Sequence, residues 1–208
     1  MRRTKAEAAE TRCSILCAAE QLFFEKGVAN SALDEIAAAA GVTRGAIYWH
    51  FASKSDLFLE LYNAAQLPRV NMAEVDDIET DEVDAFHAIE KIACDWLNEL
   101  ASDRHRQRLL SILLRTNFTE EFQPVMAELE KLDQEHTLHM ERLLSRAQRN
   151  GHLAEMWTPQ SAGRAFKWLM KGMCWDWLLF GQKFDLVEEG GDRVKRLLAS
   201  FQKLPAAN

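Results

Sequence analysis

The chain has 208 residues, of which 48% are hydrophobic and 27% charged. That balance provides a sizeable core and excludes a disordered chain. The net charge of −7 argues at first against a nucleic-acid partner. However, residues 1–62 carry 7 basic and 8 acidic side chains, whereas residues 63–208 carry 18 and 24. A nearly neutral N-terminal part that opens with Arg2, Arg3 and Lys5 can therefore still bind phosphate.

Several other classes of protein are excluded. Only 9 glycines and 4 prolines are present, which argues against collagen-like and turn-rich β proteins. No apolar run approaches the roughly 18 residues of a membrane span, and no apolar segment follows the basic N-terminus. We expect a cytoplasmic chain without a membrane partner. The four cysteines form no CxxC pair, so we expect small reduced side chains and neither a metal nor a cofactor.

Apolar spacing and capping residues predict helices from the N-terminus onward. Thr4 to Glu7 form a capping box for a first helix, which ends at Gly27. Ser31, with Asp34 three residues later, predicts the start of a second and shorter helix. Gly41 ends it, because glycine adopts the left-handed backbone that a sharp turn requires.

A third helix follows after only three residues. Thr43 is its expected N-cap, and the pair Ser53 and Asp56 predicts the start of a fourth helix. Two short helices joined by so short a glycine turn are typical of a helix-turn-helix motif. We place this motif at residues 31–50.

Further helices fill most of the remaining chain. Residues 74–84 hold seven acidic side chains and no basic one, and we interpret them as a solvated loop, with an acidic docking site as the alternative. Beyond it the apolar periodicity predicts helices over residues 86–100, 109–114, 120–149, 159–180 and 192–202. No stretch alternates like a strand. We therefore expect an all-α fold.

The third helix carries side chains suited to a DNA duplex. Thr43 and Arg44 stand at its N-terminus, the end that enters the major groove in such motifs, and Arg44 can fork onto guanine O6 and N7. Gly45 removes a side chain and lets the backbone approach. Tyr48 can donate to a phosphate and cover a thymine methyl. Lys54 opens the next helix, whose N-terminal amides favour an anion.

Other residues of the head have a second interpretation beside DNA contact. Trp49 and His50 could only pack or hydrogen-bond locally, and the basic N-terminus could be a disordered tail rather than a minor-groove arm. The complete set of expected DNA-binding residues is Ser31, Thr43, Arg44, Gly45, Tyr48, Trp49, His50, Lys54, Arg2, Arg3 and Lys5.

The motif also carries a resemblance. The sequence GVTRGAIYWHF at residues 41–51, followed by Lys54, resembles the DNA-binding domain of the TetR family of bacterial repressors. It is especially similar to the AcrR-like branch of that family, which controls multidrug efflux pumps. The C-terminal half is similar more weakly, through residues 117–120 and 184–186.

This resemblance implies a homodimer that represses a multidrug efflux operon. Each subunit would have a three-helix DNA-binding head in residues 1–55 and an all-helical body for ligand binding and dimerisation in residues 56–208. The last two helices, at about 159–181 and 191–203, would pair across a two-fold axis. Two recognition helices would then bind a pseudo-palindromic operator in double-stranded DNA. A small hydrophobic inducer in the body would move the helix that begins near Lys54 and lower operator affinity.

The body has side chains for such an inducer. Aromatic and methionine side chains are individually core by default, but together they suit an adaptable pocket. The expected ligand-binding residues are Trp96, Leu113, Asn117, Phe118, Phe166, Met170, Met173 and Trp177.

Two alternatives remain open at this point. His136 and His139 are spaced to share a metal, but nearby glutamates favour an ordinary polar face, and we expect no metal site. No nucleophile–base pair or phosphate loop stands out, so we expect no enzyme. The competing function is a helical small-molecule binding protein or enzyme without sequence-specific DNA binding. A ligand-independent or activating regulator is a third hypothesis.

Overall fold

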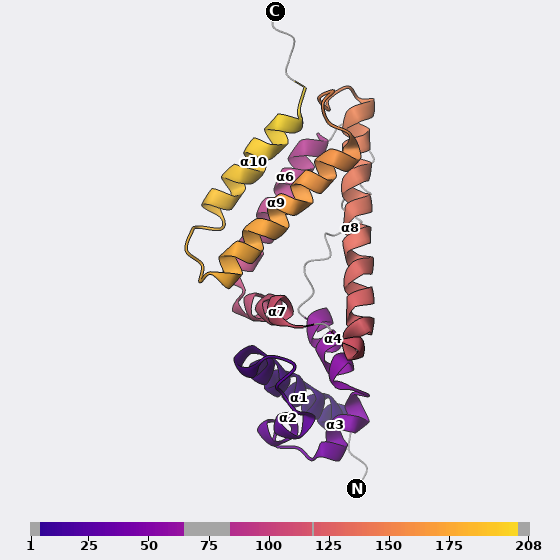
Figure 1. The fold of residues 1–208 in the computed structure, drawn as a ribbon, viewed down its shortest axis with the longest axis vertical. Helices are drawn as coiled ribbons and strands as arrows, with labels where there is room; N and C mark the ends of the chain where they lie inside the picture. The colour runs from indigo at the N-terminus through magenta and orange to yellow at the C-terminus, as the bar shows by residue number, and fades with distance from the viewer. Residues whose placement is uncertain (1–4, 65–83, 118, 204–208) are drawn as a thin grey trace, which may run out of the picture. The chain divides into compact units, whose positions relative to one another are not determined.

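The computed structural model describes residues 5–64, 84–117 and 119–203 (Figure 1). Within these ranges the regular elements are helices, apart from one isolated antiparallel bridge between Leu153 and Gln202. The expected all-α fold is confirmed. No helix in the described ranges is long and apolar enough to span a bilayer. Several expectations fall outside the described residues: the cap at Thr4, the roles of Arg2, Arg3 and Phe118, and the acidic loop up to residue 83.

The described residues fall into two compact units. The N-terminal unit contains residues 5–64 and 105–129, and the C-terminal unit contains residues 84–104 and 130–203. The N-terminal unit is built from α1 (Lys5–Lys26), α2 (Leu33–Ala39), α3 (Arg44–His50), α4 (Lys54–Ala64), α7 (Arg104–Arg115), the 3-10 turn η2 (Glu120–Phe122) and the start of α8 (Gln123–Arg149). The C-terminal unit is built from α6 (Ala85–Ser102), the rest of α8, α9 (Pro159–Leu179) and α10 (Glu188–Phe201).

Three of the expected helix starts are confirmed by their capping contacts. Thr43, Ser53 and Thr158 each accept a hydrogen bond from the backbone N–H three residues on, at 3.3, 3.0 and 3.1 Å. Each contact satisfies an N–H group that the first turn of a helix leaves unpaired. Gly27 and Gly41 have φ angles of +81° and +67°, so both ends need a backbone that glycine adopts without strain.

The cap expected at Ser31 is wrong. The hydroxyl of Ser31 donates to the carbonyl of Gly27 at 2.9 Å and closes the preceding turn instead. Ala32 is the N-cap of α2, and its N–H donates to the carboxylate of Glu35 at 3.2 Å. The pattern of a serine followed by an acid therefore correctly predicted the helix, but it placed the N-cap at Ser31, one residue before the observed N-cap at Ala32.

Three later helices also start at other residues than expected. α7 begins at Arg104 rather than 109, because its first five residues are polar and lie outside the apolar run that predicted the helix. α8 begins at Gln123 rather than 120, and Pro124, which lacks an N–H, stands in the first turn where none is required. α10 begins at Glu188 instead of Asp192. The carboxylate of Asp185 accepts the first free N–H groups of α10, at 2.9 and 2.8 Å, and so extends the helix toward the N-terminus.

A single apolar cluster holds the N-terminal unit together. α1 packs against α2, α3 and α4. Ile36 of α2, Ile47 of α3 and Phe51 are buried in one cluster with Phe23 and its neighbours on α1. Because α2 and α3 are only seven residues each, this burial rather than helix propensity determines their orientation.

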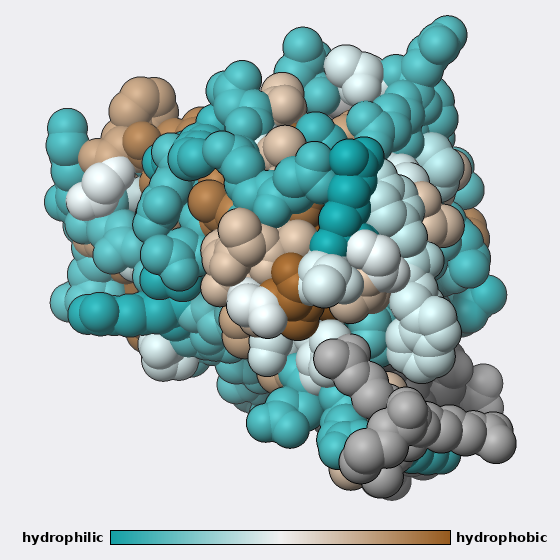
Figure 2. All heavy atoms as spheres, turned by 90° about the horizontal axis from the view of Figure 1, so that it is seen from below, coloured by the Kyte–Doolittle hydropathy of each residue, from teal (hydrophilic) through white to brown (hydrophobic). Residues whose placement is uncertain are grey.

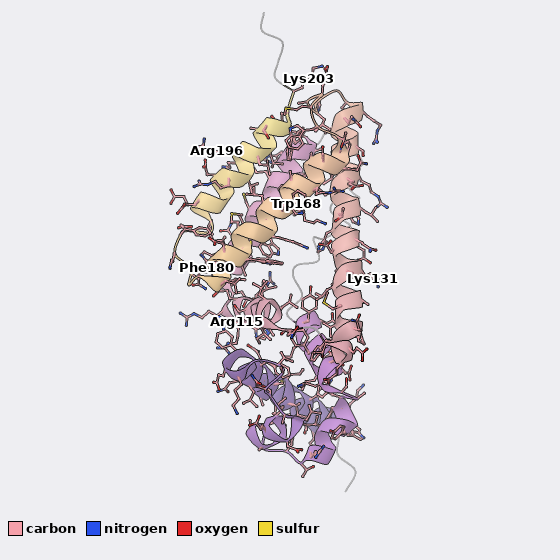
Figure 3. The ribbon with its side chains drawn as sticks, in the orientation of Figure 1. Arg115, Lys131, Trp168, Phe180, Arg196 and Lys203 are labelled. Atoms are coloured by element: carbon pink, nitrogen blue, oxygen red, sulfur yellow. The ribbon has the colours of Figure 1, made fainter. Side chains whose placement is uncertain are left out.

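A charged contact joins α1 to α7 in the same unit. The carboxylate of Glu20 is buried, at 8% side-chain exposure, and lies 3.0 Å from Nδ1 of His105 and 3.4 Å from Nη1 of Arg108. One turn on, the ring of Phe24 faces the guanidinium groups of Arg108 and Arg115, 5.4 and 5.7 Å from its centroid. Figure 3 labels Arg115 on α7. Both contacts hold α7 on the surface of α1.

In the C-terminal unit α10 packs against α6 and α9. The approach is close at Gly190, where an added Cβ would lie 3.0 Å from the sulfur of Met173 and 3.2 Å from Leu97. On the facing helices α8 and α9, Asp133 accepts hydrogen bonds from Lys167 and Lys171. Burial raises the pKa of Asp133, but the two lysines outweigh it and hold the pKa below its ordinary value.

We expect Phe23→Ala to lower the free energy of unfolding by about 3–5 kcal/mol, because it leaves a cavity in the core of the N-terminal unit. Phe23 is 1% exposed. Its neighbour Phe24 is 39% exposed, with two arginines over its ring, so Phe24→Ala serves as the matched control and should cost about 1 kcal/mol or less. Urea unfolding of both variants measures the difference. Equal losses would contradict the assignment of Phe23 to the core.

Candidate nucleic-acid interface

The helix α3 separates its side chains into a buried and an exposed face. Ile47 is fully buried, whereas Arg44, Tyr48 and Trp49 point to solvent, with Tyr48 at 48% and Trp49 at 73% exposure. Large aromatic side chains are normally buried in a soluble protein. Their exposure here makes this face of α3 a candidate contact surface. Figure 2 views the molecule from the side that carries α2 and α3, and this face is mostly hydrophilic around a small apolar patch.

An open groove of about 430 Å³ runs beside α3 within the N-terminal unit. Its walls come from the starts of α2, α3 and α4 and from the turn before α8. The lining residues are Ser31, Ala32, Leu33, Asp34, Arg44, Tyr48, Ala52, Ser53, Lys54 and Glu121. The groove thus brings together four of the residues expected to bind DNA: Ser31, Arg44, Tyr48 and Lys54.

Arg44 is held by two partners. Its Nη1 donates to Oδ2 of Asp34 at 3.1 Å, and its Nε lies 3.1 Å from Oδ1 of the same carboxylate. Its Nη2 donates to the hydroxyl of Tyr48 at 3.3 Å, and the guanidinium carbon lies 5.6 Å from the tyrosine ring centroid. The hydrogen bond to Tyr48, followed by the charge of Asp34, raises the pKa of Arg44 above its ordinary value.

The backbone at the start of α3 is open to a ligand. Among the described residues, an added Cβ at Gly45 would meet only Oγ1 of Thr43, at 4.0 Å, so no described neighbour requires glycine here for space. Thr43 is exposed, although its hydroxyl oxygen already caps the helix. Lys54 is half-buried at the first position of α4. Of these residues Lys54 lines the groove, whereas Gly45 leaves the backbone at the start of α3 without a side chain.

The remaining head residues lie at different places. Ser31 is buried with its hydroxyl used by Gly27, and Lys5 is exposed in the first turn of α1. The ring of Trp49 meets that of His50 edge-on, with centroids 4.5 Å apart, so His50 supports the exposed indole. Asp34 and Glu121 were not expected at this surface. Asp34 was interpreted only as a helix cap, and no sequence signal pairs it with a residue ten positions later.

The residues expected to bind an inducer are divided between the two units. Leu113 and Asn117 belong to the N-terminal unit, half-buried and exposed respectively. The other described members lie in the C-terminal unit: Trp96, Met170 and Met173 are half-buried, and Phe166 and Trp177 are buried. The indole N–H of Trp177 donates to the carbonyl of Phe184 at 3.0 Å, which gives this side chain a structural partner.

Metal binding has no support in the described ranges, where no group of three or more His, Cys, Asp or Glu side chains could hold a metal ion. His136 lies exposed on α8 and His139 is half-buried there.

A helix-turn-helix head with an exposed recognition helix, combined with a helical C-terminal unit, defines the class of helix-turn-helix transcription regulators. The chain belongs to the TetR family. Residues 15–61 match the model of the bacterial regulatory proteins of the tetR family, and residues 84–203 match the C-terminal region of MAATS-type transcriptional repressors. The family expected from residues 41–54 is confirmed, and with it a transcriptional regulator rather than an enzyme.

Known relatives extend the similarity over nearly the whole chain. The HTH-type transcriptional repressor BepR of Brucella suis is 36% identical over 203 residues, 97% of each chain. NalD, the secondary repressor of the MexAB-OprM multidrug efflux pump in Pseudomonas aeruginosa, has a structure that matches with a TM-score of 0.86 at 32% identity, covering 96% of this chain and 99% of NalD. SmeT, the repressor of the Stenotrophomonas maltophilia multidrug efflux pump SmeDEF, matches in its complex with triclosan at a TM-score of 0.77 and 30% identity, over 95% and 96%.

Proposed function

We propose that this protein is a dimeric repressor of a multidrug efflux operon, released from a pseudo-palindromic operator by a small hydrophobic ligand. The observation that carries the proposal is the exposed pair Arg44 and Tyr48 on α3, beside a groove that also contains Lys54. The relatives that repress efflux pumps indicate which kind of operon is controlled.

The proposed DNA contacts divide into two kinds. Arg44 reads a base edge in the major groove, where a guanidinium forks onto guanine. Tyr48, Lys54 and the backbone at Gly45 bind phosphates, which position the head without reading sequence. In a dimer the two α3 helices enter successive major grooves, which lie about 34–36 Å apart along the duplex.

The first experiment is selection of bound fragments from genomic DNA, followed by titration of the recovered site. We expect Tyr48→Ala and Lys54→Ala to weaken binding of that site about 5- to 100-fold, because each removes a phosphate contact. Lys54→Ala should also flatten the salt dependence, whereas the uncharged Tyr48 releases no counterion and its loss should leave the salt slope unchanged. Fluorescence anisotropy measures both quantities. Lys203→Ala, a matched lysine of the C-terminal unit, should bind as the unaltered chain does. Failure to enrich any site would favour a small-molecule binding protein without sequence-specific DNA binding.

The dimer is proposed to form through α9 and α10. Trp168, Trp175 and Leu179 on α9 are 65%, 49% and 42% exposed, and Phe180 follows at the end of the helix. The spacing of seven and four residues places the first three on one face. Figure 3 labels Trp168 and Phe180 on this segment. So large an apolar face fits a second copy of the same helix, because a symmetric interface pairs identical patches.

We expect Trp175→Glu to convert the dimer to a monomer at micromolar concentration, because it places a charge in a desolvated interface. Light scattering after size-exclusion chromatography measures the mass. Met156→Glu alters an even more exposed apolar residue that lies outside α9 and should leave the mass unchanged. A dimeric Trp175→Glu variant with normal operator affinity would refute this interface.

The inducer is proposed to bind the aromatic and methionine side chains named above, including Trp96, Phe166 and Met170. Half-buried thioethers and indoles adapt to apolar ligands of different shape. A ligand that binds one shape of the dimer more tightly than the other shifts the protein toward that shape. The resulting change in operator affinity is limited by the difference between the ligand's affinities for the two shapes.

Triclosan is a suitable probe because it binds a relative. We expect it to lower operator affinity about 5- to 150-fold, the usual range of such coupling. Met170→Ala should reduce the response without changing operator affinity in the absence of triclosan, whereas Met156→Ala, at an exposed methionine, should respond normally. Anisotropy of the operator complex during titration gives the result. Unchanged operator affinity with triclosan and with a panel of other apolar compounds would argue against ligand release.

A further inference from the structure

The groove beside α3 contains acid as well as base. Asp34 and Glu121 lie on its walls together with Arg44 and Lys54. Carboxylates at a surface that meets a polyanion oppose binding, because they repel the phosphates. The charge of Asp34 therefore lowers the affinity for DNA, whatever the DNA sequence.

The contacts of Asp34 show what the carboxylate does for Arg44 in return for this loss of affinity. Both of its carboxylate oxygens lie 3.1 Å from nitrogens of Arg44, and Tyr48 accepts from a third nitrogen at 3.3 Å. A guanidinium has five N–H donors. Three contacts leave donors on the terminal nitrogens for a base edge. Residues of two different helices thus fix the direction of one exposed side chain.

Stability of the fold does not account for this pair. The side chains of Arg44 and Asp34 are 63% and 58% exposed, and ion pairs so open to water stabilise a fold little. When DNA covers the groove and excludes water, the same pair becomes stronger. A side chain that is already oriented also loses less conformational entropy on binding.

We propose that Asp34 is a specificity-determining residue, which holds Arg44 for base recognition and prevents it from binding the phosphates of unrelated DNA. An unpaired arginine binds any phosphate, and phosphate contacts carry no sequence information. The carboxylate neutralises the charge that attracts phosphate and keeps the planar group in position for a guanine. This inference rests on the proposed function, in which α3 enters the major groove.

The test compares Asp34→Asn with the unaltered protein on two duplexes: the site selected from genomic DNA and a scrambled duplex of the same length and composition. We expect the variant to bind the scrambled duplex about tenfold more tightly, with a salt slope steeper by about 0.9, as one additional phosphate contact gives. Affinity for the selected site should stay about the same or fall. The ratio of the two affinities should therefore fall about tenfold, within the range for loss of one bidentate base contact.

Glu35→Gln is the matched control. Glu35 is the next residue of the same helical turn, is also exposed, and pairs with Lys26 at 2.9 Å instead of with Arg44. Glu35→Gln removes the same charge as Asp34→Asn. If the charge alone has no effect on specificity, the ratio of its affinities for the two duplexes should stay within about twofold of the ratio for the unaltered protein. Asp34→Glu retains the charge and should keep most of the ratio. Circular dichroism verifies that each variant is folded.

Several outcomes would overturn the inference. A uniform rise for both duplexes in Asp34→Asn would show only a general charge effect, and no change for either would show no role at all. If the unaltered protein and the Asp34→Asn variant discriminate equally well between the two duplexes, the role of Asp34 is refuted but the proposed function stays intact. An unaltered protein that does not discriminate refutes the proposed function and, with it, the specificity that Asp34 would set.

Discussion

The packing of two very short helices against α1 is the interaction on which the interface depends. α2 and α3 are too short to be stable alone, so the burial of Ile36, Ile47 and Phe51 determines both their existence and their rotation. Burial of Ile47 turns Arg44 and Tyr48 outward on the same helix. The apolar core and the exposed contact surface are therefore two consequences of one rotational setting.

The electrostatics of the chain operate locally. A net charge of −7 does not describe the surface beside α3, where two cations and two carboxylates share one groove. Charges separated by more than about 8–10 Å are largely screened at physiological salt. The nearest groups therefore dominate the electrostatic potential in the groove, and among them Asp34 and Tyr48 both accept hydrogen bonds from Arg44.

The α1–α7 contact shows a second use of charge. Glu20 is buried with two basic partners, and Phe24 beside it is covered by arginines. Here the pairing stabilises the packing of a helix that is distant in sequence. In the groove the pair is open to water and orients a side chain instead. Burial decides between these two roles, because it decides how much solvent competes for each charge.

The sequence by itself determined the helices, their glycine and threonine boundaries, and the helix-turn-helix at residues 31–50, because periodicity, capping and left-handed turns are local properties. It also carried the family, through residues 41–54. It misplaced the cap at Ser31, whose hydroxyl had a competing partner in Gly27. Only the tertiary structure decided that Asp34 faces Arg44, that Glu121 joins the groove, and that Glu20 meets α7. These pairs join different helices, and a contact between distant residues depends on how the helices pack, which no local pattern records.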